Sequence, residues 1–563
     1  MIFPVNLATN LQGAMTSMFR PVTSDADGKF ELSSVRPGAY SLSASSPGYV
    51  SSDPDPKVFY RPGDNATITL VKGGVITGRV TNSLGEPTIG ALVRAIKIRE
   101  TNDKPVRMRG DIGSQINESM DMMLGPFKTD DRGIYRIYGL SPGYYQVAAG
   151  GRSGQGFSFG GQNTFDGDAP TYFPSGTLET AGEVTVLAGD EAANIDIRYR
   201  ENRGHSIGGT VTVSTGSAPQ AITVVLSRAV NGIVEASTVV MGRDHFGFDS
   251  LLDGEYIVTA MGTSGNLGMG ASAEGITASV SQPRRVTVSG SDVSGINLVI
   301  EPLGSIAGRV VLEPLQDAKQ KEVCKEFRPA PIEGTVLGTH DDRKETVDAI
   351  SGPLAAFKDT TPNEKSEFII SLLQPGTHWL TVRVPADHLY LKAITLPQAD
   401  PNTRPIDIAK NGVKLKSGDR IKGLIVTVRE GAARLSGKVV VGADNKAPES
   451  KMSLHLVPTE PESAEDVLRY FETAVSSDGT FALTNLPPGK YWIVGRETSD
   501  TDLAGTDRKP LAWDASARTA LRFEGEASNS LIELTQCQSV SEHRFKYVPL
   551  TKPSKPADRK PAQ

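Results

Sequence analysis

TDDRGIYRIYGLSPGYY, residues Thr129 to Tyr145, is the stretch that decides the fold. Its first part places Asp and Gly in a tight turn, because glycine readily adopts the positive φ that hairpin turns require. The residues that follow alternate between polar and apolar side chains, as in a half-buried strand. Pro142-Gly143 then bends the chain before an aromatic pair that begins another strand. The stretch therefore predicts a turn, a strand, a second turn and a second strand.

The same pattern occurs five times along the chain. Its other copies are Asp27-Gly28-Lys29-Phe30 to Tyr40, Phe246-Gly247-Phe248 to Tyr256, Ser366-Glu367-Phe368 to Trp379, and Asp478-Gly479-Thr480-Phe481 to Tyr491. The second Gly of each copy falls at residues 38, 143, 254, 376 and 489. These steps of 105 to 122 residues match the size of one compact domain. The spacing predicts a tandem array of small β domains, each with its own core.

Two further patterns give the domain limits. An opening strand recurs as GVITGRV from Gly74, SIGGTV from Ser206, SIAGRV from Ser305 and RLSGKV from Arg434. Closing strands are predicted at residues 66–70, 194–197, 296–300, 424–428 and 531–534. Together they predict domains at 1–72, 73–202, 203–303, 304–430 and 431–540. The first lacks an opening strand and is predicted to be partial, so that the chain begins inside a domain.

Composition favours the same fold class. The 563 residues include 58 Gly and 36 Pro, and only 38% of them are hydrophobic. Many short strands joined by many turns have this composition. The prediction is an all-β protein without long helices.

These motifs resemble the carboxypeptidase regulatory-like domain. The resemblance rests on the opening Ile-x-Gly-x-Val strand, the block from Thr129 to Tyr145, and the closing strand from Asn194 to Tyr199. It implies a transthyretin-like (prealbumin-like), Greek-key sandwich of seven strands, related to the carbohydrate-binding-like and collagen-adhesin B-type folds. Long arrays of this module resemble secreted or cell-envelope proteins of bacteria. The resemblance implies an accessory or binding module rather than a catalyst.

No enzymatic site is predicted. The seven His residues have no Glu three positions away, so a His-x-x-Glu zinc site is not indicated. The nearest approach to a nucleophile elbow, Gly151-Arg152-Ser153-Gly154-Gln155, lacks its last Gly. We therefore expect no catalytic residue, no cofactor and no metal, although calcium at turns such as Asp25-x-Asp27-Gly28 stays an open alternative.

Two loops are candidate ligand-binding sites. Tyr172 and Phe173 lie in the segment APTYFPSG, and Phe59 and Tyr60 lie in VFYRPG, each just before a closing strand. Exposed aromatic rings in such loops can stack on sugars or on a protein partner. The alternative is that the rings fill the edge of the sandwich and cap a turn.

Charge and cysteine content limit the partners. The net charge of −6, with its 59 basic residues spread along the chain, argues against nucleic-acid binding. Residues 541–563 carry six cations, two acids and four prolines, which predicts a disordered basic tail that contacts an anionic wall or membrane surface. Cys324 and Cys537 lie in different predicted domains, so their spacing predicts no disulfide framework.

Localisation is predicted from the resemblance. No apolar run reaches the roughly 18 residues of a membrane span, and residues 1–20 lack the basic start and apolar core of a signal peptide. We expect an extracytoplasmic protein, periplasmic, surface-exposed or secreted, whose signal peptide is not in this chain.

The predicted function follows from these points. We expect a non-catalytic, multidomain envelope or secreted protein, a monomeric and elongated chain whose modules act as spacers and adhesive surfaces. Its partner would be a polysaccharide or a cell-envelope protein. One alternative is a carbohydrate-binding protein that uses the loop aromatics. Another is an accessory region of a peptidase or an outer-membrane transporter.

Overall fold

A computed structural model describes most of the chain. The described residues are 2–5, 22–51, 58–101, 127–151, 168–214, 219, 221–230, 232, 234–240, 244–264, 277–315, 324, 330–341, 359–400, 402–442, 446–498, 511–528 and 530–548. They form two compact units: unit 1 is Met1–Gly308, Glu333–Thr381 and Val413–Lys422, and unit 2 is Arg309–Ile332, Val382–Gly412 and Gly423–Gln563. We refer to the five predicted segments as the first to fifth module, and their limits stay predictions.

The second module, in unit 1, contains two facing sheets. One has the order β10-β8-β6 with β9 beside β8, and the other has the order β11-β5-β12 with β7 beside β5. Ile76 and Ile137 from one sheet share a core with Val147 and Val186 from the other. A sandwich results. Its strands are β5 (Gly74–Thr81), β6 (Val93–Arg99), β7 (Ile134–Leu140), β8 (Gly143–Ala149), β9 (Thr171–Tyr172), β10 (Val184–Val186), β11 (Glu191–Ala192) and β12 (Ile197–Arg198).

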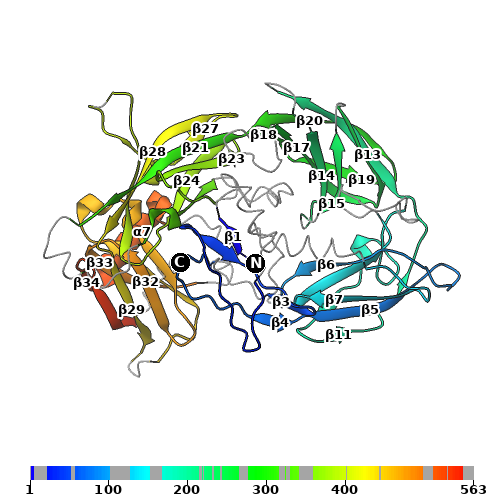
Figure 1. The fold of residues 1–563 in the computed structure, drawn as a ribbon, viewed down its shortest axis with the longest axis horizontal. Helices are drawn as coiled ribbons and strands as arrows, with labels where there is room; N and C mark the ends of the chain where they lie inside the picture. Colours follow the sequence, from blue (N-terminus) through cyan, green and yellow to red (C-terminus); the bar gives the residue numbers. More distant parts are fainter. Residues whose placement is uncertain are drawn as a thin grey trace, which may run out of the picture. The chain divides into compact units, whose positions relative to one another are not determined.

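The third module, also in unit 1, is one sheet of eight strands in the order β15-β14-β17-β18-β20-β13-β16, with β19 beside β17. Its strands β13, β14, β15, β17, β18, β19 and β20 are labelled in Figure 1. Leu226 and Val258 share a core with Phe248 and Leu298, although their strands lie in opposite halves of the sheet. The sheet therefore folds over its own apolar face. Its strands are β13 (His205–Val213), β14 (Ala221–Arg228), β15 (Val234–Val240), β16 (His245–Leu251), β17 (Gly254–Ser264), β18 (Thr277–Ser281), β19 (Arg284–Val288) and β20 (Val293–Pro302).

The fifth module, in unit 2, is a sandwich of seven strands. Its sheets have the orders β32-β29-β35 and β31-β30-β33-β34. Leu435 and Phe545 from the first sheet pack against Leu454 and Ile493 from the second. The strands are β29 (Ala433–Val441), β30 (Met452–Pro458), β31 (Phe471–Ala474), β32 (Thr480–Leu486), β33 (Gly489–Glu497), β34 (Leu531–Leu534) and β35 (Ser539–Tyr547).

The fourth and first modules are less regular. Strands of the fourth module belong to both units: β22, β23 and β27 to unit 1, β25 and β26 to unit 2, and parts of β21, β24 and β28 to each. The described part of the first module has two pairs, β1 with β2 and β3 with β4. The strands are β1 (Ile2–Pro4), β2 (Tyr40–Leu42), β3 (Tyr49–Ser51), β4 (Leu70–Lys72), β21 (Gly304–Glu313), β22 (Val336–Asp341), β23 (Glu367–Leu373), β24 (Gly376–Arg383), β25 (Leu389–Leu396), β26 (Ile406–Asp407), β27 (Val413–Leu415) and β28 (Arg420–Glu430). The predicted fold class, all-β with repeated sandwiches, is confirmed.

The repeated turn has the same geometry in all five copies. Its second Gly has a φ between 147° and 158°, at residues 38, 143, 254, 376 and 489. Two positions later the side chain of an aromatic residue, a tyrosine hydroxyl or in one copy a histidine N–H, donates a hydrogen bond to the backbone carbonyl four residues before it. The pairs are Tyr40 to Arg36, Tyr145 to Ser141, Tyr256 to Leu252, His378 to Gln374 and Tyr491 to Pro487, at 2.6–3.0 Å. The aromatic residue therefore satisfies a carbonyl that the turn removes from the sheet ladder.

The Gly of the opening strand is required for a different reason, the close approach of a neighbouring strand. Three of the four predicted opening strands pair in parallel with a strand near the end of their module, β5 with β12, β13 with β20 and β29 with β35. A Cβ built on Gly78, Gly209 or Gly437 would lie 1.9–2.1 Å from a backbone oxygen in or just before that strand. Only glycine therefore allows the two strands to approach.

The end of the fifth module differs from the prediction in two ways. Leu531–Leu534 is not its closing strand, because it pairs antiparallel with β33 and places Leu534 opposite Gly489. Its closing strand is β35, so the predicted module end at 540 and the disordered tail from 541 are wrong for residues 541–547. Val540, Phe545 and Tyr547 point their apolar side chains into the core and hold this strand in place. The rest of the predicted tail, 549–563, lies outside the described residues.

A helix is the other departure. α7 (Ala515–Ser528) spans 14 residues, where long helices are not expected from composition. Its residues are mostly Ala, Arg, Leu and Glu, which favour helix, and the Asp514 side chain accepts a hydrogen bond from the backbone N–H of Ala517 at 2.9 Å. Leu521 packs it onto Val457 and Val494, outside the sandwich core. The other α-helix of the described residues is the short α5 (Ile408–Asn411).

Candidate binding loops and module junctions

The loop with the predicted aromatics of the second module is held firmly by its backbone. Tyr172 and Gly176 exchange two hydrogen bonds of 2.9 and 2.8 Å. The Arg198 N–H donates to the Pro174 carbonyl at 2.9 Å, which ties the loop to the closing strand β12. The loop therefore has a defined shape without any ligand.

Tyr172 and Phe173 both take part in packing. Tyr172 has no exposed surface and packs with Ala148, Ala169 and Leu252. Its hydroxyl accepts a hydrogen bond of 3.4 Å from Arg228, and burial raises the pKa of Tyr172 to about 12. Phe173 is half-buried against the core of the second module. This is the packing alternative foreseen for such rings, and a ligand-binding role for either residue stays a prediction.

Phe59 and Tyr60 of the first module are also partly covered. Phe59 is buried against Val5, Ala39 and Val336. Tyr60 is half-buried and exchanges backbone hydrogen bonds of 2.8 and 2.9 Å with Tyr40. A ligand-binding role for these two residues likewise stays a prediction.

A pocket with several polar side chains lies beside the Tyr172 loop. It has a volume of about 390 Å³ and is lined by Pro174, Ser175, Gly176, Thr177, Thr180 and Arg200. Thr180 ends the short 3-10 helix η1 (Leu178–Thr180). Sequence reasoning identified the loop but missed Arg200, because that residue comes after β12 and approaches the loop only in the folded sandwich.

The carboxylates of the acidic turn residues accept hydrogen bonds from backbone N–H groups. The Asp25 carboxylate accepts from the N–H groups of Asp27 and Lys29 at 3.0 and 2.8 Å. Asp130 accepts from Arg132 and Ile134 in the same way, at 3.0 and 2.7 Å. Turn geometry accounts for these carboxylates. Within the described residues no group of three His, Cys, Asp or Glu side chains is arranged to hold a metal ion.

One serine–histidine contact resembles a catalytic pair. Ser453 Oγ lies 2.9 Å from His455 Nε2 on β30. Their residues are only 1% and 2% exposed, so a substrate cannot reach either group in this structure. We interpret the pair as part of the packed outer face of β30.

The contact between the second and third modules, within unit 1, contains a buried ion pair. Arg228 Nε donates to Glu235 Oε2 at 2.9 Å, and the two side chains are 4% and 9% exposed. The Arg228 guanidinium also lies 5.7 Å from the centre of the Tyr172 ring, across the module boundary. Burial opposes ionisation of Glu235, but the charge of Arg228 outweighs it and lowers the pKa of Glu235.

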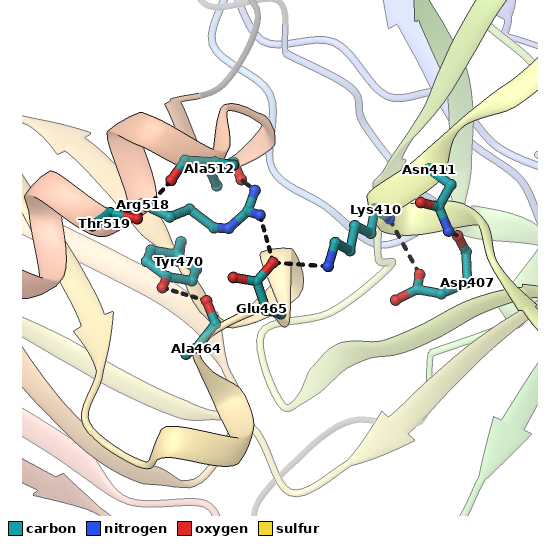
Figure 2. Close-up of polar contacts among 10 residues, drawn as sticks. Asp407, Lys410, Asn411, Ala464, Glu465, Tyr470, Ala512, Arg518 and Thr519 are labelled. Atoms are coloured by element: carbon teal, nitrogen blue, oxygen red, sulfur yellow. Dashed lines mark hydrogen bonds and ion pairs between the residues drawn. The ribbon is translucent and has the colours of Figure 1, made fainter.

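The contact between the fourth and fifth modules, within unit 2, also contains a group of oppositely charged side chains. Lys410 of α5 and Arg518 of α7 reach the Glu465 carboxylate from opposite sides (Figure 2). The distances are 2.7 Å from Lys410 Nζ and 2.8 Å from Arg518 Nη2, both to Oε2 of Glu465. Hydrogen bonds from these two cations lower the pKa of Glu465. Arg518 is buried and its Nη1 also donates to the Ala512 carbonyl at 2.7 Å.

Two more links hold this second contact. Asn485 Nδ2 lies 2.8 Å from the carbonyls of both Ala386 and Leu389. Cys324 and Cys537 form a disulfide, a pairing that could not be read from their spacing in the sequence. Sequence spacing gave no signal for it, because 213 residues separate the two cysteines and only folding brings them together.

None of the helices in the described part of the chain combines the length and the apolar character needed to cross a membrane. No family model matches the sequence. No curated protein matches it either.

Solved structures align with parts of the chain at low similarity. The TIE protein of Bacillus anthracis is 10% identical with a TM-score of 0.14, over 85% of this chain and 70% of that one. A streptococcal ancillary pilin is 10% identical with a TM-score of 0.16, over 62% and 99%. A polysaccharide-binding candidate from Bacteroides thetaiotaomicron is 6% identical with a TM-score of 0.16, over 31% and 76%. TM-scores this far below 0.5 carry no argument about fold or function.

Proposed function

We propose that the chain is a non-catalytic, extracytoplasmic protein whose modules act as stiff spacers that present binding surfaces. The observation that carries the proposal is the pair of polar contacts that join neighbouring modules, Arg228–Glu235 with Tyr172 and Lys410–Glu465–Arg518. The disulfide between Cys324 and Cys537 supports an oxidising, extracytoplasmic location, where such bonds persist. The resemblance of the repeated motif to carboxypeptidase regulatory-like modules supports the same role.

The physical reason is that these contacts resist hinge motion. Interfaces between domains of one chain are usually small and permit relative movement. Opening the first contact would break the hydrogen bond from Arg228 to the Tyr172 hydroxyl and expose the buried Arg228–Glu235 pair, both of whose members belong to the third module. Opening the second would separate Glu465 from Lys410 of the fourth module, while Arg518 stays beside Glu465 within the fifth module, and it would strain a covalent bond. Modules joined in this way keep a fixed spacing, which is what a spacer requires.

Distances between spin labels test stiffness directly. Tyr138 on β7 and Val299 on β20 are 54% and 42% exposed, so labelled Tyr138→Cys and Val299→Cys report on the second and third modules. We expect one narrow distance distribution in the full chain and a broader one after Arg228→Ala. A broad distance distribution in the labelled chain that retains Arg228 would count against the spacer role.

A second candidate is carbohydrate binding. The observation that favours it is the pocket beside Tyr172, whose lining includes three hydroxyl side chains and one guanidinium. A small number of well-placed polar groups fixes the orientation of a ligand in its pocket, and hydroxyl and guanidinium groups can bond the hydroxyls of a sugar. Retention of the purified chain on insoluble and soluble polysaccharides, including peptidoglycan, tests it. If the chain bound none of these polysaccharides, the spacer role would be the one remaining proposal.

A further inference from the structure

The pocket beside Tyr172 has a positively charged lining. Its six lining residues include one cation, Arg200, and no carboxylate. The volume of about 390 Å³ lies at the small end of the range for ligand pockets, roughly 300–1,000 Å³. The pocket therefore favours a small, hydroxylated ligand that carries a negative charge.

Arg200 is oriented by contacts that leave one edge of its guanidinium available. Its Nε donates to Ser175 Oγ at 3.3 Å, and Ser175 Oγ in turn donates to the Arg198 carbonyl at 2.9 Å. Within the described residues, no hydrogen bond or ion pair engages the two Nη atoms of Arg200. That edge of a guanidinium matches a carboxylate through two parallel hydrogen bonds.

The two threonines supply hydroxyl groups next to this cation. Thr180 Oγ1 accepts from the Thr177 N–H at 3.0 Å, which fixes its position. Thr177 Oγ1 faces the Thr180 backbone N–H in a capping box and lies 3.4 Å from Thr180 Oγ1, so part of its hydrogen-bonding capacity remains for a ligand. A Cβ on Gly176 would lie 2.2 Å from Thr180 Oγ1, so glycine is needed to keep the pocket wall in this shape.

We propose that this pocket binds a carboxylate-bearing sugar residue of an acidic polysaccharide. Arg200 takes the carboxylate with its two Nη groups, and Thr177 and Thr180 exchange hydrogen bonds with the sugar hydroxyls. The proposal deepens the binding role suggested above and rests on it, whereas the spacer role is independent of it. An acidic peptide offers the same charge but fewer hydroxyls, so the threonine side chains favour the sugar.

Calorimetric titration of the full chain with trigalacturonic acid tests the assignment. The methyl ester of the same trisaccharide removes the charge and keeps the shape, and a peptide of three glutamates supplies charge without sugar hydroxyls. We expect binding of the free acid at least about tenfold tighter than that of the ester or the peptide, because a charge-assisted pair contributes this much. Equal binding of acid and ester, tighter binding of the peptide, or no binding of the acid would overturn the proposal.

Variants locate the site. Arg200→Ala is expected to weaken binding about tenfold or more, and Arg200→Lys to recover only part of it, because lysine lacks the planar fork. Arg203→Ala is the matched control, since Arg203 is exposed and lies outside the pocket. The Arg200 backbone bonds to Thr171 are retained in both Arg200 variants, and an unchanged melting temperature verifies folding. Equal effects of Arg200→Ala and Arg203→Ala would show nonspecific charge attraction and refute the site.

Discussion

Arg228 and Glu235 form an ion pair of 2.9 Å on the neighbouring strands β14 and β15, and both side chains are at least nine-tenths buried. The Arg228 Nη2 also reaches the Tyr172 hydroxyl of the preceding module at 3.4 Å. Arg228 therefore forms an ion pair inside the third module and a hydrogen bond with the second module. A buried pair of this kind adds little net stability against an apolar replacement, but the loss of one partner is costly.

We expect Arg228→Ala to destabilise the third module by about 3–5 kcal/mol, because it leaves the Glu235 carboxylate buried without its partner. Hydrogen exchange of the full chain, followed over residues 254–260 and 171–176, measures the effect. Arg285→Ala is the matched control: it breaks an ion pair with Glu255 whose side chains are 60% and 56% exposed. The control is expected to change stability by about 0–1 kcal/mol. A similar loss in both variants would contradict the importance of burial.

The same pair predicts a pH dependence. The pKa of Glu235 is lower in the folded chain than the ordinary value of about 4.3. Its contribution to stability is therefore complete above that value and is lost as the pH falls through the folded pKa. Protection factors over residues 221–240, which take account of the slower intrinsic amide exchange in acid, should fall as the pH drops below about 4. Glu235→Gln should remove this part of the acid sensitivity, and an unchanged acid profile in that variant would disprove the assignment.

The repeat was predictable from the sequence because its turns depend on local backbone geometry. Gly143 and Gly489 have φ angles of 158° and 155°, which side chains rarely tolerate, so glycine recurs at these positions. The aromatic residues two positions later follow for the same reason, since each satisfies a carbonyl of its own turn. Local rules of this kind can be read in one sequence, and they carry the prediction of an all-β array.

The features that the sequence did not predict depend on distant contacts. β35 is interrupted by Glu542 with a φ of 59°, and its exposed cations resemble those of a tail, so its pairing with β29 is not visible locally. Arg200 enters the pocket, and Cys324 meets Cys537, only once the strands are packed. The sequence predicted that four loop aromatics could bind a ligand: Tyr172, Phe173, Phe59 and Tyr60. Only the structure shows how far packing covers their side chains.

Gly437 offers a test of the parallel strand pair in the fifth module. A Cβ at this position would lie 1.9 Å from the His543 carbonyl oxygen, so Gly437→Ala must push β35 away from β29. We expect a loss of roughly 2–4 kcal/mol and faster hydrogen exchange in residues 539–547, as for other forced clashes in packed regions. Gly247→Ala is the control, because Gly247 is also on a strand and has no atom within 4 Å of the added Cβ. Equal exchange in both variants would refute the close approach.

The disulfide predicts a redox-dependent stability of the contact between the fourth and fifth modules. Its loop closes over 213 residues, and the loop-entropy model assigns up to about 5 kcal/mol to such a cross-link. Replacing both cysteines, Cys324→Ser with Cys537→Ser, should lower the melting temperature of the chain, and a reductant should lower that of the unmodified protein similarly. The reductant should leave the double variant unchanged, which separates loss of the bond from other effects of reduction. Peptide mapping without reductant verifies the pairing directly, because the peptides with Cys324 and Cys537 should be recovered as one linked species. Recovery of both as free thiols from protein purified under oxidising conditions would contradict the bond, and with it the covalent part of the argument for a stiff contact.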